Sequence, residues 1–166
     1  ACYQNAEGWK EFPTIVGDLG TLSYDITVNV ETAGTFGDAL NSAMVAVGCD
    51  DAWDIDKLTV TGNINNDDLN YIRNNMCNSL EALDLSTATV EGNYFAEFIL
   101  SGCVFTELKL PANIERMNRH AIYNTGITSI TIPNSVIEMG DRVMSNCRSL
   151  TSITLGNGLT HIPDGL

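Results

Sequence analysis

Apolar and polar positions follow a pattern that recurs through the second half of the chain. Three segments, 108–114, 130–136 and 153–159, open with an apolar–polar–apolar triplet. A Pro or Gly follows each triplet directly, and another apolar residue stands four positions after its end. The first apolar residues of the corresponding triplets are Leu58, Leu83, Leu108, Ile130 and Ile153. Their spacings of 25, 25, 22 and 23 residues predict a stacked repeat architecture.

A single unit of this kind cannot bury its apolar side, whereas stacked units can, because each adds one strand and one layer of core. The period lies within the ~20–29 residues of leucine-rich repeats. The pattern therefore predicts an α/β repeat solenoid of the leucine-rich-repeat type over residues 57–166, with about five units and the C-terminal one cut short. Its parallel strands are expected to form one sheet on the concave face.

The preceding residues, 21–56, predict an N-terminal cap made of one strand and one helix. Residues 24–30 alternate between apolar and polar side chains, which indicates a half-buried strand. From Phe36 to Val47, apolar residues recur at helical spacing. Thr35 is a suitable N-cap for this helix and Gly48 a suitable stop.

Two more strands are expected at 58–62 and 80–86, with a helix between them. Asn66 is the expected N-cap of this helix, and its inward face comprises Leu69, Ile72 and Met76. The segment 87–103 is rich in aromatic residues. Its dense apolar group, Tyr94 to Leu100, predicts a further helix, and an exposed aromatic patch there is the alternative to a core role.

Side chains that alternate with the buried leucines are the candidate ligand-binding residues. In a parallel sheet these positions point outward and stack into ladders across neighbouring strands. They are Lys57, Thr59, Asp84, Glu107, Lys109, Ser129, Thr131, Ser152 and Thr154.

The repeat resembles the leucine-rich repeats of BspA-like surface proteins of Bacteroides-type bacteria. Residues 128–136 and 147–153 carry the core of the resemblance, and 24–166 is its approximate extent. Residues 3–12 are similar to the closing segment of such arrays, so 1–20 is interpreted as a tail or cap segment with a linker. The resemblance implies an exported or cell-surface location and a binding or adhesion role, with no enzyme activity and no agreed ligand.

Charge excludes some partners. The formal net charge is −13 at pH 7, which argues against nucleic acid and anionic membrane surfaces. Residues 1–108 hold 17 of the acids and 3 of the bases.

No apolar run is long enough to span a bilayer, so no membrane insertion is expected. The segment is expected to be mature or part of a longer protein, and self-association through its uncapped C-terminal end is one possibility.

The cysteines and the acidic clusters each have a structural interpretation and an alternative. Cys77, Cys103, Asn124 and Cys147 are expected as small residues stacking between units, with a Cys77–Cys103 disulfide as the alternative. The acidic stretch 50–56 lacks the order of a calcium loop and is interpreted as a solvated surface. The pair Asp84 and Glu107 would suggest the two acids of a glycosidase. Lysines stand in the same ladders, however, so ion pairs between neighbouring strands are the favoured interpretation. No cofactor or metal is expected.

The sequence thus predicts a non-catalytic binding or adhesion module that recognises a host or bacterial surface protein, or a glycan, through the concave sheet. The first alternative is a structural spacer that displays a neighbouring domain. An enzyme is the weakest alternative, because a shallow sheet seldom provides a pocket with converging titratable groups.

Overall fold

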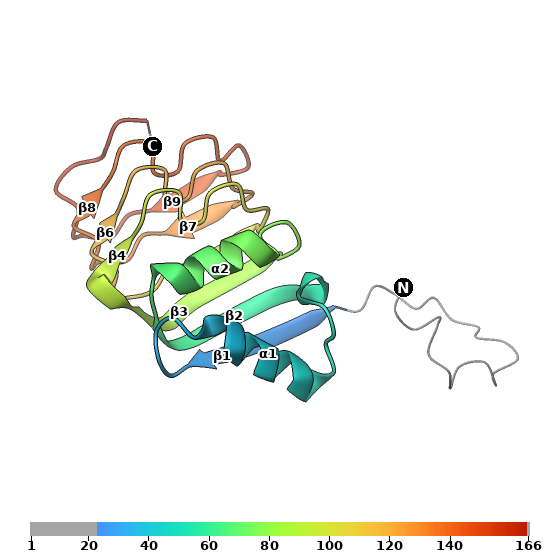
Figure 1. Ribbon diagram of the computed structural model, residues 1–166. Helices are drawn as coiled ribbons and strands as arrows, with labels where there is room; N and C mark the ends of the chain where they lie inside the picture. The colour runs from blue at the N-terminus through green and yellow to red at the C-terminus, as the bar shows by residue number, and fades with distance from the viewer. Residues whose placement is uncertain (1–22, 166) are drawn as a thin grey trace, which may run out of the picture.

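The computed structural model describes residues 23–165. Its elements follow one another along the chain in layers (Figure 1). Parallel strands β1 (Tyr24–Val30), β2 (Ile55–Ile64), β3 (Ala82–Val90) and β5 (Glu107–Lys109) form a four-stranded sheet in that order. Strands β7 (Ser129–Thr131) and β9 (Ser152–Thr154) form a two-stranded parallel sheet farther along the chain.

The elements that cover the other side of the core change along the chain from helices to strands. At its N-terminal end, helices α1 (Phe36–Val47) and α2 (Asn66–Met76) cover the four-stranded sheet. Farther on, a third parallel sheet takes their place (Figure 1). It consists of β4 (Tyr94–Phe95), β6 (Arg116–Met117) and β8 (Glu138–Met139). Two short 3-10 turns, η3 (Ala52–Asp54) and η4 (Glu91–Asn93), complete the elements.

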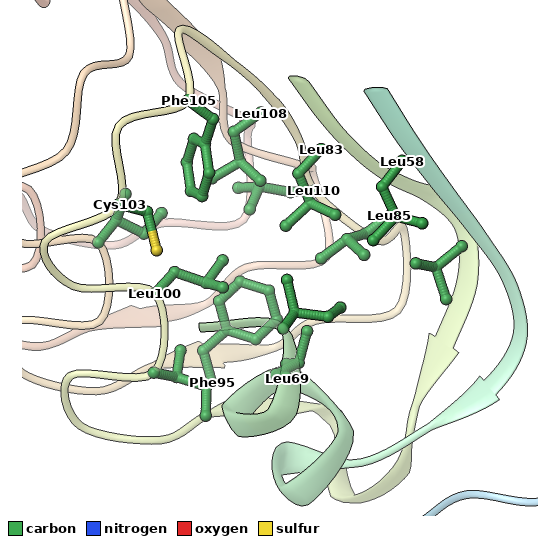
Figure 2. Packing of buried hydrophobic residues seen from close by; sticks show 14 of the residues in the cluster. Leu58, Leu69, Leu83, Leu85, Phe95, Leu100, Cys103, Phe105, Leu108 and Leu110 are labelled. Atoms are coloured by element: carbon green, nitrogen blue, oxygen red, sulfur yellow. The ribbon is translucent and has the colours of Figure 1, made fainter. Parts of the chain in front are cut away.

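The predicted leucine rows are the centre of the core. Leu58 is opposite Leu83, and Leu83 is opposite Leu108, on neighbouring strands. Figure 2 shows these three side chains in a row, facing Leu69 of α2 and Phe95 of β4. All five are at most 5% exposed. The layers therefore stack as the period predicts, and together they support an α/β repeat fold.

One sheet was expected where the structure has two. Strands β5 and β7 are neighbours, since the backbone N–H of Thr128 donates to the carbonyl of Thr106 at 3.1 Å. Among the described residues, no ladder joins β5 to β7. The first apolar residues Leu83 and Leu108 thus belong to one sheet, and Ile130 and Ile153 to another. The prediction of a single continuous sheet was wrong at this step.

The segment 87–103 is not helical, which corrects the expectation drawn from its apolar density. Phe98 and Gly102 have left-handed backbones, with φ of 59° and 80°, so no continuous α-helix can pass through them. The equivalent positions one unit later, His120 and Asn124, have φ of 58° and 55°. The segment is therefore a regular layer. Phe95, at 0% exposed, belongs to the core, whereas Phe98 is 40% exposed and stacks on the ring of His120.

The start of α1 is held by a residue from the next helix. Thr35 occupies the N-cap position, but its hydroxyl donates to the Thr32 carbonyl instead of capping the helix. The buried carboxylate of Asp68 accepts from the backbone N–H of Phe36 at 2.9 Å and of Gly34 at 2.7 Å. Because the first N–H groups of a helix have no partner within it, this carboxylate satisfies the Phe36 donor, which burial would otherwise leave unpaired, and it also ties the turn at Gly34 to α2.

Asp68 also belongs to the cap of its own helix. Asn65, not the expected Asn66, is the N-cap of α2: its side chain accepts from the N–H of Asp67 and Asp68, and Asp68 accepts from the Asn65 N–H at 3.0 Å. Asn66 has a different role. Its amide bonds the Tyr94 carbonyl at 3.2 Å and the Ala96 N–H at 2.9 Å, and so pairs with the edge of β4.

Threonine side chains connect successive layers at the start of the strands. The hydroxyl of Thr128 donates to the Thr106 carbonyl at 3.4 Å, and that of Thr151 to the Thr128 carbonyl at 3.1 Å. Thr106 makes the equivalent contact to Glu81 at 3.5 Å. We call Thr106, Thr128 and Thr151 the threonine spine. It adds one side-chain bond between layers to each backbone bond there.

The capping role of Asp68 gives a test of stability. Asp68→Asn is expected to lower the free energy of unfolding by about 2–3 kcal/mol, because an amide group replaces a charged acceptor that binds three backbone N–H groups. Urea unfolding followed by circular dichroism measures this. Asp67→Asn is the matched control, since Asp67 lies in the same helical turn but is exposed. It is expected to cost less than about 1 kcal/mol. Equal losses in the two variants would contradict the capping role.

Candidate functional site

The predicted ligand-binding residues lie on neighbouring strands. Thr59 is opposite Asp84, and Asp84 is opposite Lys109, while Lys57 and Glu107 flank Ala82 in the adjacent row. Beyond the break between the sheets, Ser129 pairs with Ser152 and Thr131 with Thr154. We call the nine predicted residues the ladder face. Seven of them are exposed, and Thr59 and Asp84 are half-buried.

An ion pair lies at the middle of this face. The ammonium Nζ of Lys109 is 2.6 Å from Oδ2 of Asp84, and Oδ1 of Asp84 accepts from the backbone N–H and the hydroxyl of Ser86 at 2.9 and 2.6 Å. Burial alone would raise the pKa of Asp84, but the hydrogen bonds from Lys109 and Ser86 outweigh it and hold that pKa below its usual value. The same hydrogen bond raises the pKa of Lys109.

This arrangement bears on the alternative of a paired-acid enzyme. In a glycosidase, one of the two carboxyls must carry a proton near neutral pH, which requires a raised pKa. The pKa of Asp84 is lowered, and Asp84 is opposite Lys109 and not opposite Glu107. The Asp84 carboxylate is therefore a charged, hydrogen-bonded group suited to holding its neighbours in place, not a proton donor.

A groove opens where the two sheets part. It has a volume of about 490 Å³ and lies between β5 and β7. The ladder-face residues Glu107, Lys109, Ser129 and Thr131 line it, together with Thr128 and Pro133. Leu108 and Ile130, which are at most 5% exposed, also border it. The groove exists because the two strands, joined at Thr106 and Thr128, make no ladder beyond that point in the described chain.

Sequence reasoning identified four of the groove's polar residues but not the groove itself. It also missed Ser86, which orients Asp84, and Thr128, which lines the groove and belongs to the threonine spine. The signal for Thr128 was present, because a threonine stands two residues before the first apolar residue in three successive units. No such pattern indicated where the sheet would divide.

The remaining candidate chemistry resolves into structural contacts. Asp51 accepts from the Trp53 N–H at the start of η3, at 3.0 Å. Within residues 23–165, no cluster of three or more His, Cys, Asp or Glu side chains is placed to hold a metal ion. His120 stacks on Phe98, with ring centroids 4.8 Å apart, and meets Tyr123 edge-on at 5.1 Å.

Among the four residues expected to stack between units, Asn124 does not take that role. Asn124 is exposed, and Thr125, its neighbour, takes the buried position. Its hydroxyl lies 3.1 Å from the sulfur of Cys147. Cys103 and Cys147 are buried as expected, and Cys77 is half-buried. Asn124 instead adopts a left-handed backbone and its side chain receives a hydrogen bond from the amide of Asn146.

Comparison with known proteins agrees with the repeat. The family model for the BspA type leucine rich repeat region matches residues 70–166, more than half of the chain, in six copies. No curated protein matches the sequence. Neither α1 nor α2, the two α-helices of the described chain, is long and apolar enough to cross a membrane.

The ion pair gives a test by titration. Lys109→Ala is expected to raise the pKa of the Asp84 carboxyl, because it removes the charge and the hydrogen bond that favour the ionised form. Carbon-detected NMR of the carboxyl resonance measures the change. Lys57→Ala is the control, since Lys57 faces Asp25 at 4.0 Å, and it is expected to leave this pKa in place.

The pH dependence of stability follows from the same lowering of the Asp84 pKa. A carboxyl whose folded pKa is depressed stabilises the fold above its unfolded pKa of ~3.9, and this contribution disappears as the pH falls through the folded value. Acid unfolding of Lys109→Ala should therefore show a smaller loss of stability from Asp84 than the wild type does. An unchanged Asp84 titration in Lys109→Ala would contradict the ion pair.

Proposed function

Since the chain belongs to the BspA-type leucine-rich repeat family, we propose that it is a non-catalytic module that binds a surface protein through the ladder face. Repeats of this family suggest protein-interaction or adhesion modules, and the family is generally non-enzymatic. BspA-type domains are typically found in surface or secreted bacterial proteins. An exported location for this chain is part of the proposal.

The observation that carries the proposal is the run of exposed polar side chains on strands whose inner residues are buried. Lys109 and Thr131, for example, are exposed, whereas Leu108 and Ile130 beside them are 5% and 4% exposed. A strand held by its core loses little backbone entropy when a partner binds, so its outward side chains are already in position. We take this face to be the concave side of the solenoid, with residues 21–56 as its N-terminal cap.

The groove between β5 and β7 suggests what the partner contributes. Its lining offers one ammonium, one carboxylate and hydroxyls from Thr128, Ser129 and Thr131, together with the apolar residues Leu108, Leu110 and Ile130. A partner side chain with an apolar stem and a polar end would satisfy both parts. A groove of about 490 Å³ is within the range of sites that hold a few side chains.

The composition of the face limits the affinity. None of its nine residues is Trp, Tyr or Arg, the types that dominate strong protein interfaces. We therefore expect a dissociation constant near the micromolar range for one copy. The same lack of anchoring residues is the observation that favours the second candidate, a spacer that displays a neighbouring domain.

The test has two stages. The protein is first applied to arrays of bacterial and host surface proteins and of glycans. A protein ligand supports the proposal, a response confined to glycans replaces the partner class, and silence on both arrays favours the spacer.

The ligand found in the first stage is then titrated against the double variant Lys109→Ala, Thr131→Ala, which removes one side chain from each side of the groove. Its affinity is expected to fall about tenfold, which corresponds to ~1.4 kcal/mol, with nearly unchanged thermal unfolding. Arg119→Ala is the control, because it removes an exposed positive charge from the loop after β6, away from the ladder face. Equal affinities for the double variant and the wild type would exclude this face.

A further inference from the structure

Two cysteines from successive layers meet at one edge of the core. Cys77 is the C-cap of α2, and Cys103 lies in the loop before β5, 26 residues later. Their thiol groups are in contact, with the sulfur atoms 2.6 Å apart. The backbone fixes this approach, because the N–H of Val104 donates to the Cys77 carbonyl at 2.9 Å. Figure 2 shows Cys103 beside the core residues Leu100 and Phe105.

The two thiols differ in access and acidity. Cys103 is 1% exposed, whereas Cys77 is only half-buried. The contact with the Cys103 thiol lowers the pKa of Cys77, against the effect of its own burial, and the positive charge of Arg73 lowers it further. The pKa of Cys103 is raised by the same contact and by burial. Cys77 is thus the thiol that ionises first and can be reached from outside.

The other described cysteines lack such a partner. The thiol of Cys147 donates to the Ile122 carbonyl at 3.1 Å and lies beside the hydroxyl of Thr125. Cys49 donates to the Asp51 carbonyl at 3.2 Å. In residues 23–165, Cys77 and Cys103 are the one pair of cysteines whose sulfur atoms are in contact.

We propose that Cys77 and Cys103 are a site of reversible oxidation, at which a small-molecule disulfide converts the two thiols into a bond that links α2 to the following repeat layer. The inference rests on the contact between the sulfur atoms and on the backbone bond that holds it, and it is independent of the ladder face.

The chemistry proceeds in two exchanges. The Cys77 thiolate attacks one sulfur of the oxidant, the oxidant's S–S bond breaks, and one thiolate leaves, which gives a mixed disulfide at Cys77. The Cys103 thiol then attacks the Cys77 sulfur, its proton passes to the departing second thiolate, and that group leaves as a thiol. The protein gives up two electrons and two protons, and the oxidant becomes two thiols. A reduced dithiol reverses both steps.

The experiment incubates the protein with oxidised glutathione, alkylates the remaining thiols, and digests with trypsin and Glu-C together. The chain cleaves after Arg73, Glu81, Glu97 and Glu107, so Cys77 and Cys103 fall in separate peptides, 74–81 and 98–107. Mass spectrometry is expected to show these two joined, two hydrogens lighter than their sum. Since the bond closes a loop of 26 residues, the melting temperature should rise by about 10 °C and return with dithiothreitol.

Variants separate this pair from the other thiols. Cys77→Ser and Cys103→Ser should each abolish the joined peptides and the reversible rise in melting temperature, whereas Cys147→Ser should retain both. Alkylated Cys77 and Cys103 in the oxidised wild type, or a bond from either to a different cysteine, would overturn the proposal. Because the peptide analysis uses the wild-type chain, this result does not depend on any variant folding.

Discussion

Burial of each layer against the next is the constraint on which this structure depends. Each layer covers part of its apolar side with its own helix or second strand, but its leucines and isoleucines are fully hidden only when layers stand before and after it as well. Phe95, Phe105 and Ile114, which have layers on both sides of them, are 0% exposed.

This constraint explains how one core accommodates two coverings. Where α1 and α2 lie over the sheet, buried residues such as Leu40 and Leu69 supply the opposing apolar side. Where β4, β6 and β8 replace them, Met117 and Met139 do so from strands only two residues long. Asn66 joins the two regions, because its side chain supplies β4 with the hydrogen bonds that a preceding strand would give.

The sequence was informative where the fold depends on periodicity. The row of Leu58, Leu83 and Leu108, the strand at Tyr24–Val30 and the inward face of α2 all follow from spacing alone. Backbone conformation at single residues was not readable in this way. Phe98 is left-handed where its layer turns, and a phenylalanine does not signal that conformation, so the apolar run around it was wrongly predicted as a helix.

Contacts between distant segments were equally hidden. Nothing local indicates that Asp68 caps α1, 32 residues earlier, because the choice depends on how the two helices pack. The position of the candidate site was predicted in part. The outward residues followed from alternation, whereas the groove depends on strands β5 and β7 parting, which is a property of two layers together and not of either sequence.

The threonine spine has a consequence for how such a chain can change over generations. Each hydroxyl bonds the carbonyl of the layer before it, and that carbonyl is supplied by Glu81 in one layer and by another threonine in the next two. The connection therefore uses main-chain oxygen, which every amino acid provides. A gene that gained or lost one repeat by unequal recombination would encode layers that still fit, so the length of the stack is free to drift while its joints stay the same.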